Sequence, residues 1–414
     1  MSEVVCVDVG STYTKAAKID LAGARLVTRA ETPTTTGTDV LAGLDAAVAA
    51  VGGTGLPLYV CSSAGGGLRL AVVGYESLVT AEAGHRVGLS AGAQVVHVAA
   101  GPLTGAAITA LRAARPDVLL LVGGTDGGDG EVLLHNARRL AANRLRIPVV
   151  LAGNAEVRTE AREILENRGV PVTVTGNVLP RIGVLDPLPA RAAIREVFLK
   201  HVIGGKRLSK GPRFASLVRA ATPDAVLAGV ELLADRAAAG VLVVDVGGAT
   251  TDVYSALLPD AEEETGPRRD VAGTLWRSRT VEGDLGVAVG ADATREAAAA
   301  EKLPVPREDR ELAATAAMIA LRRHARGHAA GPGLPRTGGR DLRDVRLVVG
   351  SGGVLRHGGG EHVLGALLAD TAGGWALPDR ARTVVDTRYV LAAAGLLSTD
   401  HPAVATGLLD TLLS

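Results

Sequence analysis

Apolar residues in this chain gather in short runs that end in glycine, and the clearest run is followed at once by a second. The stretch VLVVDVGGATTDVYS, residues 241–255, passes from four aliphatic residues to Asp245, through Gly247 and Gly248, and back to apolar residues at Val253. A short apolar run bounded by glycines is typical of a buried strand, and glycine lets the chain reverse tightly. The pattern predicts a strand, a glycine turn and a returning strand.

The same pattern occurs at the N-terminus. VVCVDVGSTYTK, residues 4–15, again runs from apolar residues to an aspartate (Asp8), a glycine and hydroxyl residues, and then continues as a strand to Ile19. A third run, LVVGSGGV at 347–354, also leads into glycines. Any one of these turns is compatible with an ordinary hairpin. The repetition favours two related half-domains that face each other.

Such turns suit a site for phosphate and a metal ion. Backbone N–H groups in a glycine turn converge on an anion, and threonine hydroxyls add donors. Carboxylates such as Asp245 and Asp252 are the oxygen ligands that a hydrated hard cation prefers. The sequence therefore predicts a metal–phosphate site at the turns.

In this order, two phosphate turns and a glycine-rich loop resemble the actin–sugar kinase–Hsp70 ATPase superfamily. The resemblance implies an α/β fold: duplicated actin-like ATPase (ribonuclease H-like) half-domains around a nucleotide cleft, with an inserted parallel βαβ region. It implies ATP and Mg²⁺ as cofactors, with the purine near residues 350–354. The residues expected to contact ATP are Gly10, Ser11, Thr12, Thr14, Lys15, Gly247, Gly248, Ala249, Thr250, Thr251, Gly350, Ser351, Gly352 and Gly353.

Asp8, Asp245 and Asp252 are the expected catalytic residues. They would hold the waters of Mg²⁺ or orient an attacking water, while Lys15 would neutralise phosphate charge. We expect the first half-domain to span residues 1–236, including bridging helices and an insertion at about 85–200, and the second to span 237–414.

The expected insertion alternates strands and helices. Strands at 117–124, 148–153 and 172–176 enclose helices at 131–145 and 155–168, which predicts parallel βαβ units. Each strand ends in glycine and a small polar residue, so these ends either line one edge of a cleft or simply close tight loops. The role of Asp126, in the first of these loops, stays open.

The composition argues against several classes of protein. Hydrophobic residues make up 47% of the 414 residues, charged residues 21%, aromatic residues 2%, and the net charge is zero. Few aromatics argue against base stacking, and zero net charge against nucleic acid or an anionic membrane as partner. No apolar stretch reaches membrane-spanning length and no signal-peptide pattern is present, so we expect a cytoplasmic protein.

Longer stretches carry a more specific resemblance. LLLVGGTDGGDGE, PVVLAGNAEV, GNVLPRIGVLDPLPARAAIREVFLKHVI and TVEGDLG, in this order, look like the MutL/GlmL family encoded with adenosylcobalamin-dependent glutamate mutase. This implies a chaperone-like, slow ATPase that assists or reactivates a cobalamin-dependent carbon-skeleton mutase. The implied partners are mutase subunits. Which mutase is served, and whether the protein is a homodimer, stays open.

Two other functions stay open. A small-molecule kinase on the same fold needs a catalytic base, for which Asp126 or Asp252 could serve. An activator of a radical enzyme needs an iron–sulfur cluster, yet Cys6 is expected in a core strand and Cys61 stands alone. Glu282 and Asp284 could orient the waters of a metal, although exposed helix-entry carboxylates are the plainer interpretation. His324 and His328 have metal-compatible spacing without a third ligand.

Overall fold

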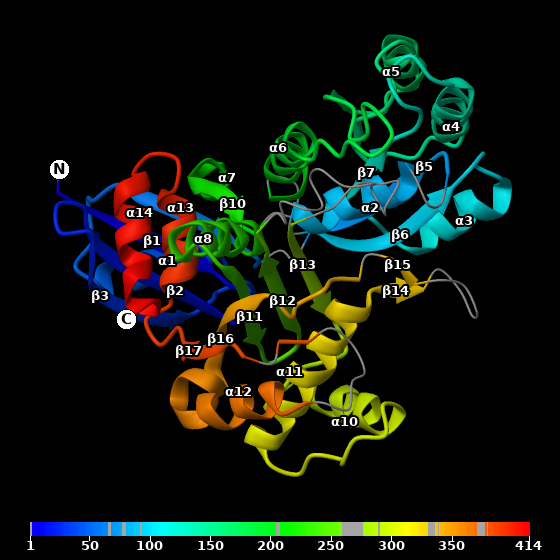
Figure 1. The fold of residues 1–414 in the computed structure, drawn as a ribbon. Coiled ribbons are helices and arrows are strands. Elements are labelled where there is room, and N and C mark those ends of the chain that lie inside the picture. Colours follow the sequence, from blue (N-terminus) through cyan, green and yellow to red (C-terminus); the bar gives the residue numbers. More distant parts are fainter. Residues whose placement is uncertain are drawn as a thin grey trace.

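The computed structural model describes residues 2–64, 68–76, 80–91, 93–203, 208–258, 276–288, 290–329, 336–337, 339–370, 377–378 and 380–414. Within them, two five-stranded sheets share one topology (Figure 1). The first has the order β10-β4-β1-β2-β3 and the second β17-β16-β11-β12-β13. In each sheet, three successive antiparallel strands are followed by two parallel ones. This is the ribonuclease H-like arrangement, and the chain is a duplicated actin-like fold.

The strand bounds agree closely with the hydrophobic pattern. The first sheet consists of β1 (Glu3–Val9), β2 (Tyr13–Asp20), β3 (Arg25–Pro33), β4 (Leu58–Ser62) and β10 (Val218–Ala221). The second consists of β11 (Gly240–Val246), β12 (Thr251–Ala256), β13 (Arg277–Glu282), β16 (Val345–Ser351) and β17 (Arg382–Val385). The three repeated runs are β1, β11 and β16. Because β1 and β11 occupy the same place in their sheets, the predicted duplication is confirmed.

A third sheet is entirely parallel, with the order β6-β5-β7-β8-β9. The expected βαβ units are present as β7 (Val118–Leu121), α4 (Glu131–Ala142), β8 (Val149–Leu151), α5 (Arg158–Glu166) and β9 (Val172–Val174). Two further strands, β5 (Arg69–Gly74) and β6 (Gln94–Ala100), extend the sheet, with α2 (Thr80–Ser90) and α3 (Gly105–Ala113). The sheet therefore starts before residue 85, because β5 pairs with both β6 and β7. The proposed division into two half-domains stays a prediction.

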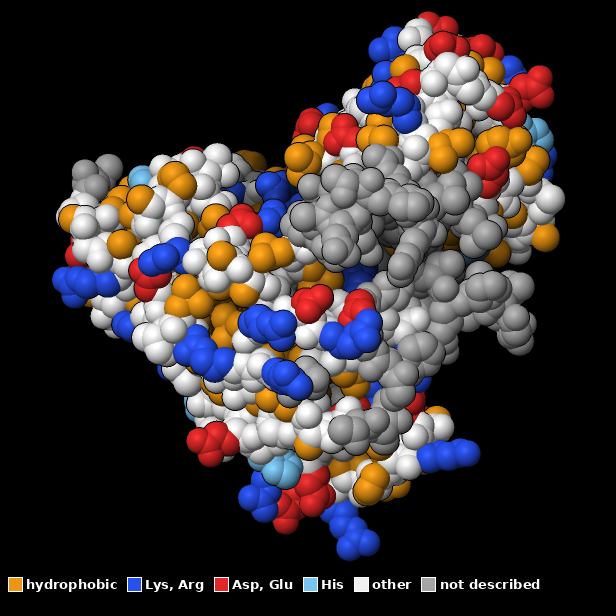
Figure 2. Space-filling view, viewed as in Figure 1, with side chains coloured by type: hydrophobic (Ala, Val, Ile, Leu, Met, Phe, Trp, Pro, Cys, Tyr) orange, Lys and Arg blue, Asp and Glu red, His pale blue; other side chains and the backbone are white. Residues whose placement is uncertain are grey.

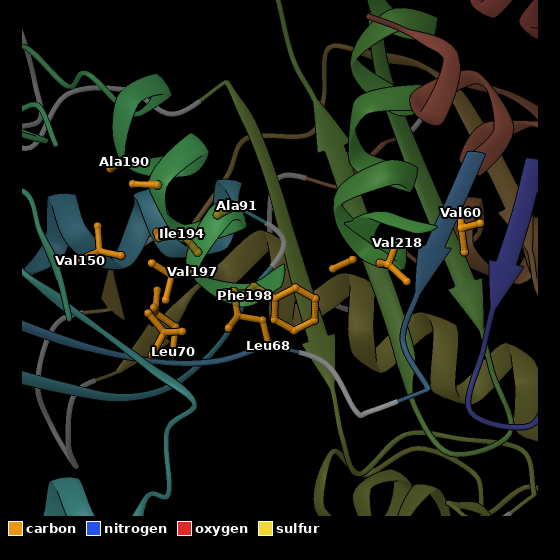
Figure 3. Close-up of a cluster of buried hydrophobic side chains, with 14 of the residues drawn as sticks. Val60, Leu68, Leu70, Ala91, Val150, Ala190, Ile194, Val197, Phe198 and Val218 are labelled. Atoms are coloured by element: carbon orange, nitrogen blue, oxygen red, sulfur yellow. The ribbon is translucent and has the colours of Figure 1, made fainter. Parts of the chain in front are cut away.

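The third sheet shares its core with the first. Buried Val60 and Val218 of the first sheet belong to the same apolar cluster as Leu70 and Val150 of the third. Phe198, on a short π-helix (Phe198–Ile203) that follows α6 (Leu188–Val197), lies between these groups (Figure 3). The third sheet projects from the rest of the molecule, and charges of both signs are mixed over the face that Figure 2 shows.

Helices α8 (Thr222–Ala237) and α13 (Val390–Leu397) pack side by side where the first two sheets meet (Figure 1). Their backbones touch at two glycines: a side chain on Gly229 would overlap the carbonyl of Leu391, and one on Gly395 the carbonyl of Ala225. Small residues permit this approach. The two helices therefore form a close seam between the halves.

The remaining helices cover the sheets. They are α1 (Val40–Ala50), α7 (Arg213–Leu217), α10 (Ala291–Ala300), α11 (Asp309–Arg326), α12 (Gly360–Leu368) and α14 (Pro402–Leu409), with the short helices η2 (Leu355–Gly359) and η3 (Asp410–Leu412). A two-stranded ribbon joins β14 (His328–Ala329) to β15 (Arg336–Thr337). In the part of the chain that the structure describes, no helix combines the length and apolarity needed to cross a membrane.

Candidate functional site

The two turns predicted to bind phosphate close in the same way. The N–H of Gly10 donates to the carbonyl of Tyr13 at 3.0 Å, and that of Gly247 to the carbonyl of Thr250 at 2.9 Å. A Cβ at Gly10 or Gly247 would lie 2.7 or 2.9 Å from the same oxygen, so each turn itself requires glycine. The exposed residues of the two turns are Ser11, Thr12, Tyr13, Gly248 and Ala249. Their exposure leaves the turns accessible to an anion.

Asp8 lies next to the end of β1 and is 6% exposed. Its carboxylate accepts hydrogen bonds from the Thr222 hydroxyl at 2.5 Å and from the Cys61 thiol at 3.6 Å. The Lys15 ammonium lies 3.9 Å from the other carboxylate oxygen. Thr222 is the first residue of α8, so the seam helix helps to orient Asp8.

Asp245 occupies the equivalent place in β11. Burial raises the pKa of Asp245 to about 6; the charge of Lys15 opposes this, and the like charges of Asp252 and Asp8 add to it. The Ser351 hydroxyl donates a hydrogen bond to the same carboxyl. Carboxylates that repel one another beside open turns are a suitable environment for a divalent cation. Asp8 and Asp245 are therefore suited to hold the Mg²⁺ that the fold implies.

Asp252 has a different environment. Its Oδ1 accepts hydrogen bonds from Arg279 Nε at 2.9 Å and Nη2 at 2.5 Å. The Arg279 side chain is 5% exposed and that of Asp252 17%, so the pair is largely withdrawn from solvent. The carboxylate of Asp252 therefore already has a fixed counter-charge, unlike that of Asp245.

Thr14 and Thr251, which directly follow the two turns, are fully buried. The Thr14 hydroxyl is 3.0 Å from the Thr34 hydroxyl, and Thr251 donates to the carbonyl of Leu285 at 2.9 Å. In this conformation both hydroxyls form hydrogen bonds inside the protein and so stabilise the turns. The turn residues named above are exposed and Lys15 is partly exposed, whereas these two hydroxyls are out of reach of solvent.

The third glycine loop divides into packing and open positions. A Cβ at Gly350 would lie 2.6 Å from the Leu355 side chain. Gly352 has φ +102°, and a Cβ there would overlap the carbonyl of Val246. Gly353 has no neighbour within 4 Å of the Cβ position and is exposed. Structure alone therefore requires glycine at Gly352, whereas Gly353 leaves room for a ligand.

The end of the TVEGDLG motif (residues 280–286) and the residues just after it brace the second turn. The N–H groups of Val287, Ala288 and Gly290 donate to the carbonyls of Gly247 and Gly248 at 3.2, 2.8 and 3.1 Å. Thr294 in turn donates to and accepts from this segment, at Gly286. Gly286, the last residue of this motif, permits the close contact, because a Cβ there would lie 2.6 Å from the carbonyl oxygen of Gly248.

The other polar residues singled out from the sequence are engaged in structure. The Asp126 carboxylate accepts from the Ala155 N–H and the Asn177 amide, both at 2.9 Å. Arg323 binds Glu282 at 2.8 Å and Asp284 at 2.7 Å. These carboxylates are thus partners of an arginine rather than the exposed helix-entry groups expected.

His324 is fully buried. Its ring nitrogens lie 2.9 Å from the Thr280 hydroxyl and 2.8 Å from the Ser255 hydroxyl. Among the described residues, no group of three or more His, Cys, Asp or Glu side chains is placed to hold a metal ion. Mg²⁺ is commonly bound through one or two carboxylates together with water and substrate phosphates.

A pocket of about 390 Å³, part of it open to solvent, adjoins Asp8 and Lys15. Strands β1 to β3 form one wall and the start of α13 the other, with Cys6 in the wall and Tyr389 at the start of the helix. Burial raises the pKa of the Cys6 thiol to about 12. The pocket is continuous with the aspartate and lysine of the first turn.

The chain is similar in sequence to known proteins over nearly its whole length. The model of the family described as MutL protein matches residues 4–309 and 303–413. The protein MutL of Clostridium tetanomorphum is 33% identical over 463 aligned residues, which cover 100% of this chain and 99% of that protein.

Solved structures align more loosely. Nucleotide-free acetone carboxylase is 15% identical, with a TM-score of 0.39, over 95% of this chain and 70% of that one. Xylulose kinase from Bifidobacterium adolescentis is 12% identical, with a TM-score of 0.32, over 99% of this chain and 93% of that one. On the full-length sequence matches, this chain belongs to the MutL family.

Proposed function

We propose that this protein is a slow, chaperone-like ATPase that binds Mg²⁺·ATP and assists or reactivates an adenosylcobalamin-dependent carbon-skeleton mutase of the glutamate mutase type. The observation that carries the proposal is the pair of identically closed turns, each preceded by an aspartate of an actin-like half-domain. Family membership supports the accessory role, since the resemblance drawn from the sequence implies service to a mutase.

Each part of the site has a task in this proposal. The exposed residues of the two turns supply backbone N–H groups to phosphate oxygens, and Lys15 balances their charge. Asp8 and Asp245 hold the waters of the metal or orient an attacking water. ATP, when bound, supplies the phosphate bond that is hydrolysed. The protein then has one state before hydrolysis and another after it. Asp252 contributes by holding Arg279, and so stabilises the second hairpin.

Coupling to a partner requires that the partner bind the two states with different affinity. The seam of α8 and α13 is well placed for this, because Thr222 of α8 contacts Asp8 directly. A change at Asp8 on nucleotide binding would therefore reach the seam through a hydrogen bond.

The alternatives receive less support. The two carboxylates considered as a kinase base, those of Asp126 and Asp252, are both held by hydrogen bonds to neighbouring groups. Cys6 and Cys61 are buried in β1 and β4, and burial raises the pKa of both thiols. Iron–sulfur ligation requires thiolates, which such burial opposes.

The test uses a cobalamin-dependent mutase inactivated by a non-exchanging cobalamin. This protein, Mg²⁺·ATP and fresh coenzyme are added, and mutase activity is followed. We expect activity to return with wild-type protein and ATP, and to stay absent with Asp8→Asn or without ATP. Equal recovery in all three arms would contradict ATP-driven reactivation. Phosphate transfer from ATP to a metabolite rather than to water would favour a kinase.

A further inference from the structure

Tyr389 has an unusual backbone conformation. It precedes α13 directly and has φ +60° and ψ 44°, in the left-handed region. A bulky residue is rare in this region, and such residues persist where the surroundings enforce them, often at functional sites. Here the buried carboxylate of Asp386 accepts the N–H groups of Val390 and Leu391 at 3.1 and 3.2 Å. The turn is therefore fixed from both sides of Tyr389.

Two cations lie against the Tyr389 ring. The Lys15 ammonium is 3.7 Å from the ring centroid, and the Arg356 guanidinium carbon is 4.8 Å from it. Both distances are within the range of a cation–π attraction, which strengthens when the partners are shielded from water. Lys15 is the lysine of the first phosphate turn, so the ring contacts a residue of the proposed nucleotide site.

Arg356 is itself anchored. Its Nη2 lies 2.7 Å from Glu31, and its side chain is only 4% exposed. Glu31 on β3 is the register partner of Lys15 on β2. Lys15, Tyr389, Arg356 and Glu31 thus form a closed cluster. Two members come from the first sheet, and the other two follow strands of the second.

We propose that Tyr389 is a positioning residue that holds the Lys15 ammonium beside Asp8, where it can meet nucleotide phosphate. Lysine carries a point charge on a flexible four-carbon stem. A lysine without contacts along that stem loses much side-chain conformational entropy when it binds a ligand. The ring reduces that loss by fixing the stem before the nucleotide arrives. This assignment rests on the proposed binding of Mg²⁺·ATP.

The test measures the affinity of the full chain for Mg²⁺·ATP and for adenosine by calorimetry. In Tyr389→Asn the aromatic ring is lost while the left-handed backbone is tolerated. Tyr389→Leu is a second variant that adds no amide. We expect both to bind Mg²⁺·ATP about tenfold more weakly and adenosine unchanged, because adenosine has no phosphate for Lys15 to meet. Tyr389→Phe keeps the ring and should stay within about twofold of wild type.

A double-mutant cycle with Lys15→Met shows whether Tyr389 acts through Lys15. In the Lys15→Met background, Tyr389→Asn should cause no further loss of affinity for Mg²⁺·ATP. Tyr59 provides a matched control, because Arg219 lies 3.9 Å from its ring centroid at a place away from the turns. Tyr59→Leu should lower the melting temperature and leave both affinities unchanged.

Three outcomes would overturn the assignment. They are unchanged affinity for Mg²⁺·ATP in Tyr389→Asn and Tyr389→Leu, an equal loss for ATP and adenosine, and a full further loss in the Lys15→Met background. In each case wild-type binding shows that the proposed function survives. If the wild type binds no Mg²⁺·ATP at all, the proposed function fails, and the positioning role with it.

Discussion

The two glycine turns share a backbone hydrogen bond and differ in the charges beside them. Both turns close on a glycine N–H, and both follow an aspartate at the end of the first strand. The residue paired with that aspartate is Lys15 in the first hairpin and Asp252 in the second. The Lys15 ammonium lies at the pocket, whereas the carboxylate of Asp252 is paired with Arg279. Duplication thus preserved the turn, and one pair of equivalent positions acquired different tasks.

The largest expected effect is a loss of stability at Asp252 that is not expected at the equivalent position, Lys15. Asp252→Ala removes the carboxylate paired with the buried guanidinium of Arg279, which should cost about 3–5 kcal/mol of unfolding free energy. Lys15→Met, at the equivalent position, should cost less than about 1 kcal/mol and instead weaken Mg²⁺·ATP binding. Denaturant unfolding and calorimetry measure the two quantities.

The double variant Asp252→Leu/Arg279→Met is the control for this prediction. Replacing a buried ion pair by apolar residues is often neutral, so stability should return close to that of the wild type. If Asp252→Ala keeps full stability and loses only hydrolysis, Asp252 acts on the nucleotide and the proposed difference between the hairpins is wrong.

The aspartates that the hairpins share should behave alike. Asp8→Asn and Asp245→Asn keep the shape of the side chain and remove the charge that holds the metal's waters. We expect each to reduce Mg²⁺-dependent phosphate release at least about 100-fold while the melting temperature changes little. Full turnover by either variant would show that its aspartate takes no part in hydrolysis.

The sequence predicted the strands better than the contacts. Continuous apolar runs marked β1, β11 and β16, because a strand buried on both faces is apolar throughout. The short strands β10 (VRAA) and β17 (RTVV) were not foreseen, since only their pairing with β4 and β16 makes them strands. Pairing between distant segments leaves no local pattern.

The same limit applies to the candidate site. Asp8, Asp245 and the turn residues could be found from the repeat alone. The pairing of Asp252 with Arg279 depends on the register of β12 against β13, in which Tyr254 is opposite Arg279. The position of Tyr389 over Lys15 depends on two segments almost a whole chain apart. Neither contact has a signature in sequence spacing.

A smaller effect distinguishes two neighbouring glycines of the third loop. Gly353→Ala has open space around its Cβ and should change stability by less than about 0.5 kcal/mol, but should weaken nucleotide binding if the ligand lies there. Gly352→Ala is the matched control, because its positive φ and the Val246 carbonyl should make it clearly destabilising. Equal nucleotide affinity in Gly353→Ala and wild type would show that the ligand does not contact this loop.

A pH-dependent effect on stability concerns His324 in the second half. Burial, with the charge of Arg340 adding to it, holds the pKa of His324 well below its usual value of 6.5. The native ring is therefore neutral, while the unfolded ring takes up a proton near pH 6.5. This contribution to stability is present above pH 6.5 and is lost as the pH falls, by up to about 1.4 kcal/mol per unit.

His324→Gln keeps a polar group near Ser255 and Thr280 and removes this titration. Unfolding free energies at pH 7.5 and 5.5 should fall by about 1 kcal/mol more in wild type than in the variant. An identical fall in both proteins would show that His324 is already protonated in the native state.

Calorimetric titration of the full chain with ATP measures whether the two hairpins together hold Mg²⁺·ATP. We predict one ATP per chain in the presence of Mg²⁺, with much weaker binding when the metal is chelated and in both Asp8→Asn and Asp245→Asn. Binding that is absent, that is indifferent to Mg²⁺, or that depends on only one of the two aspartates would show that the two hairpins do not hold the nucleotide together.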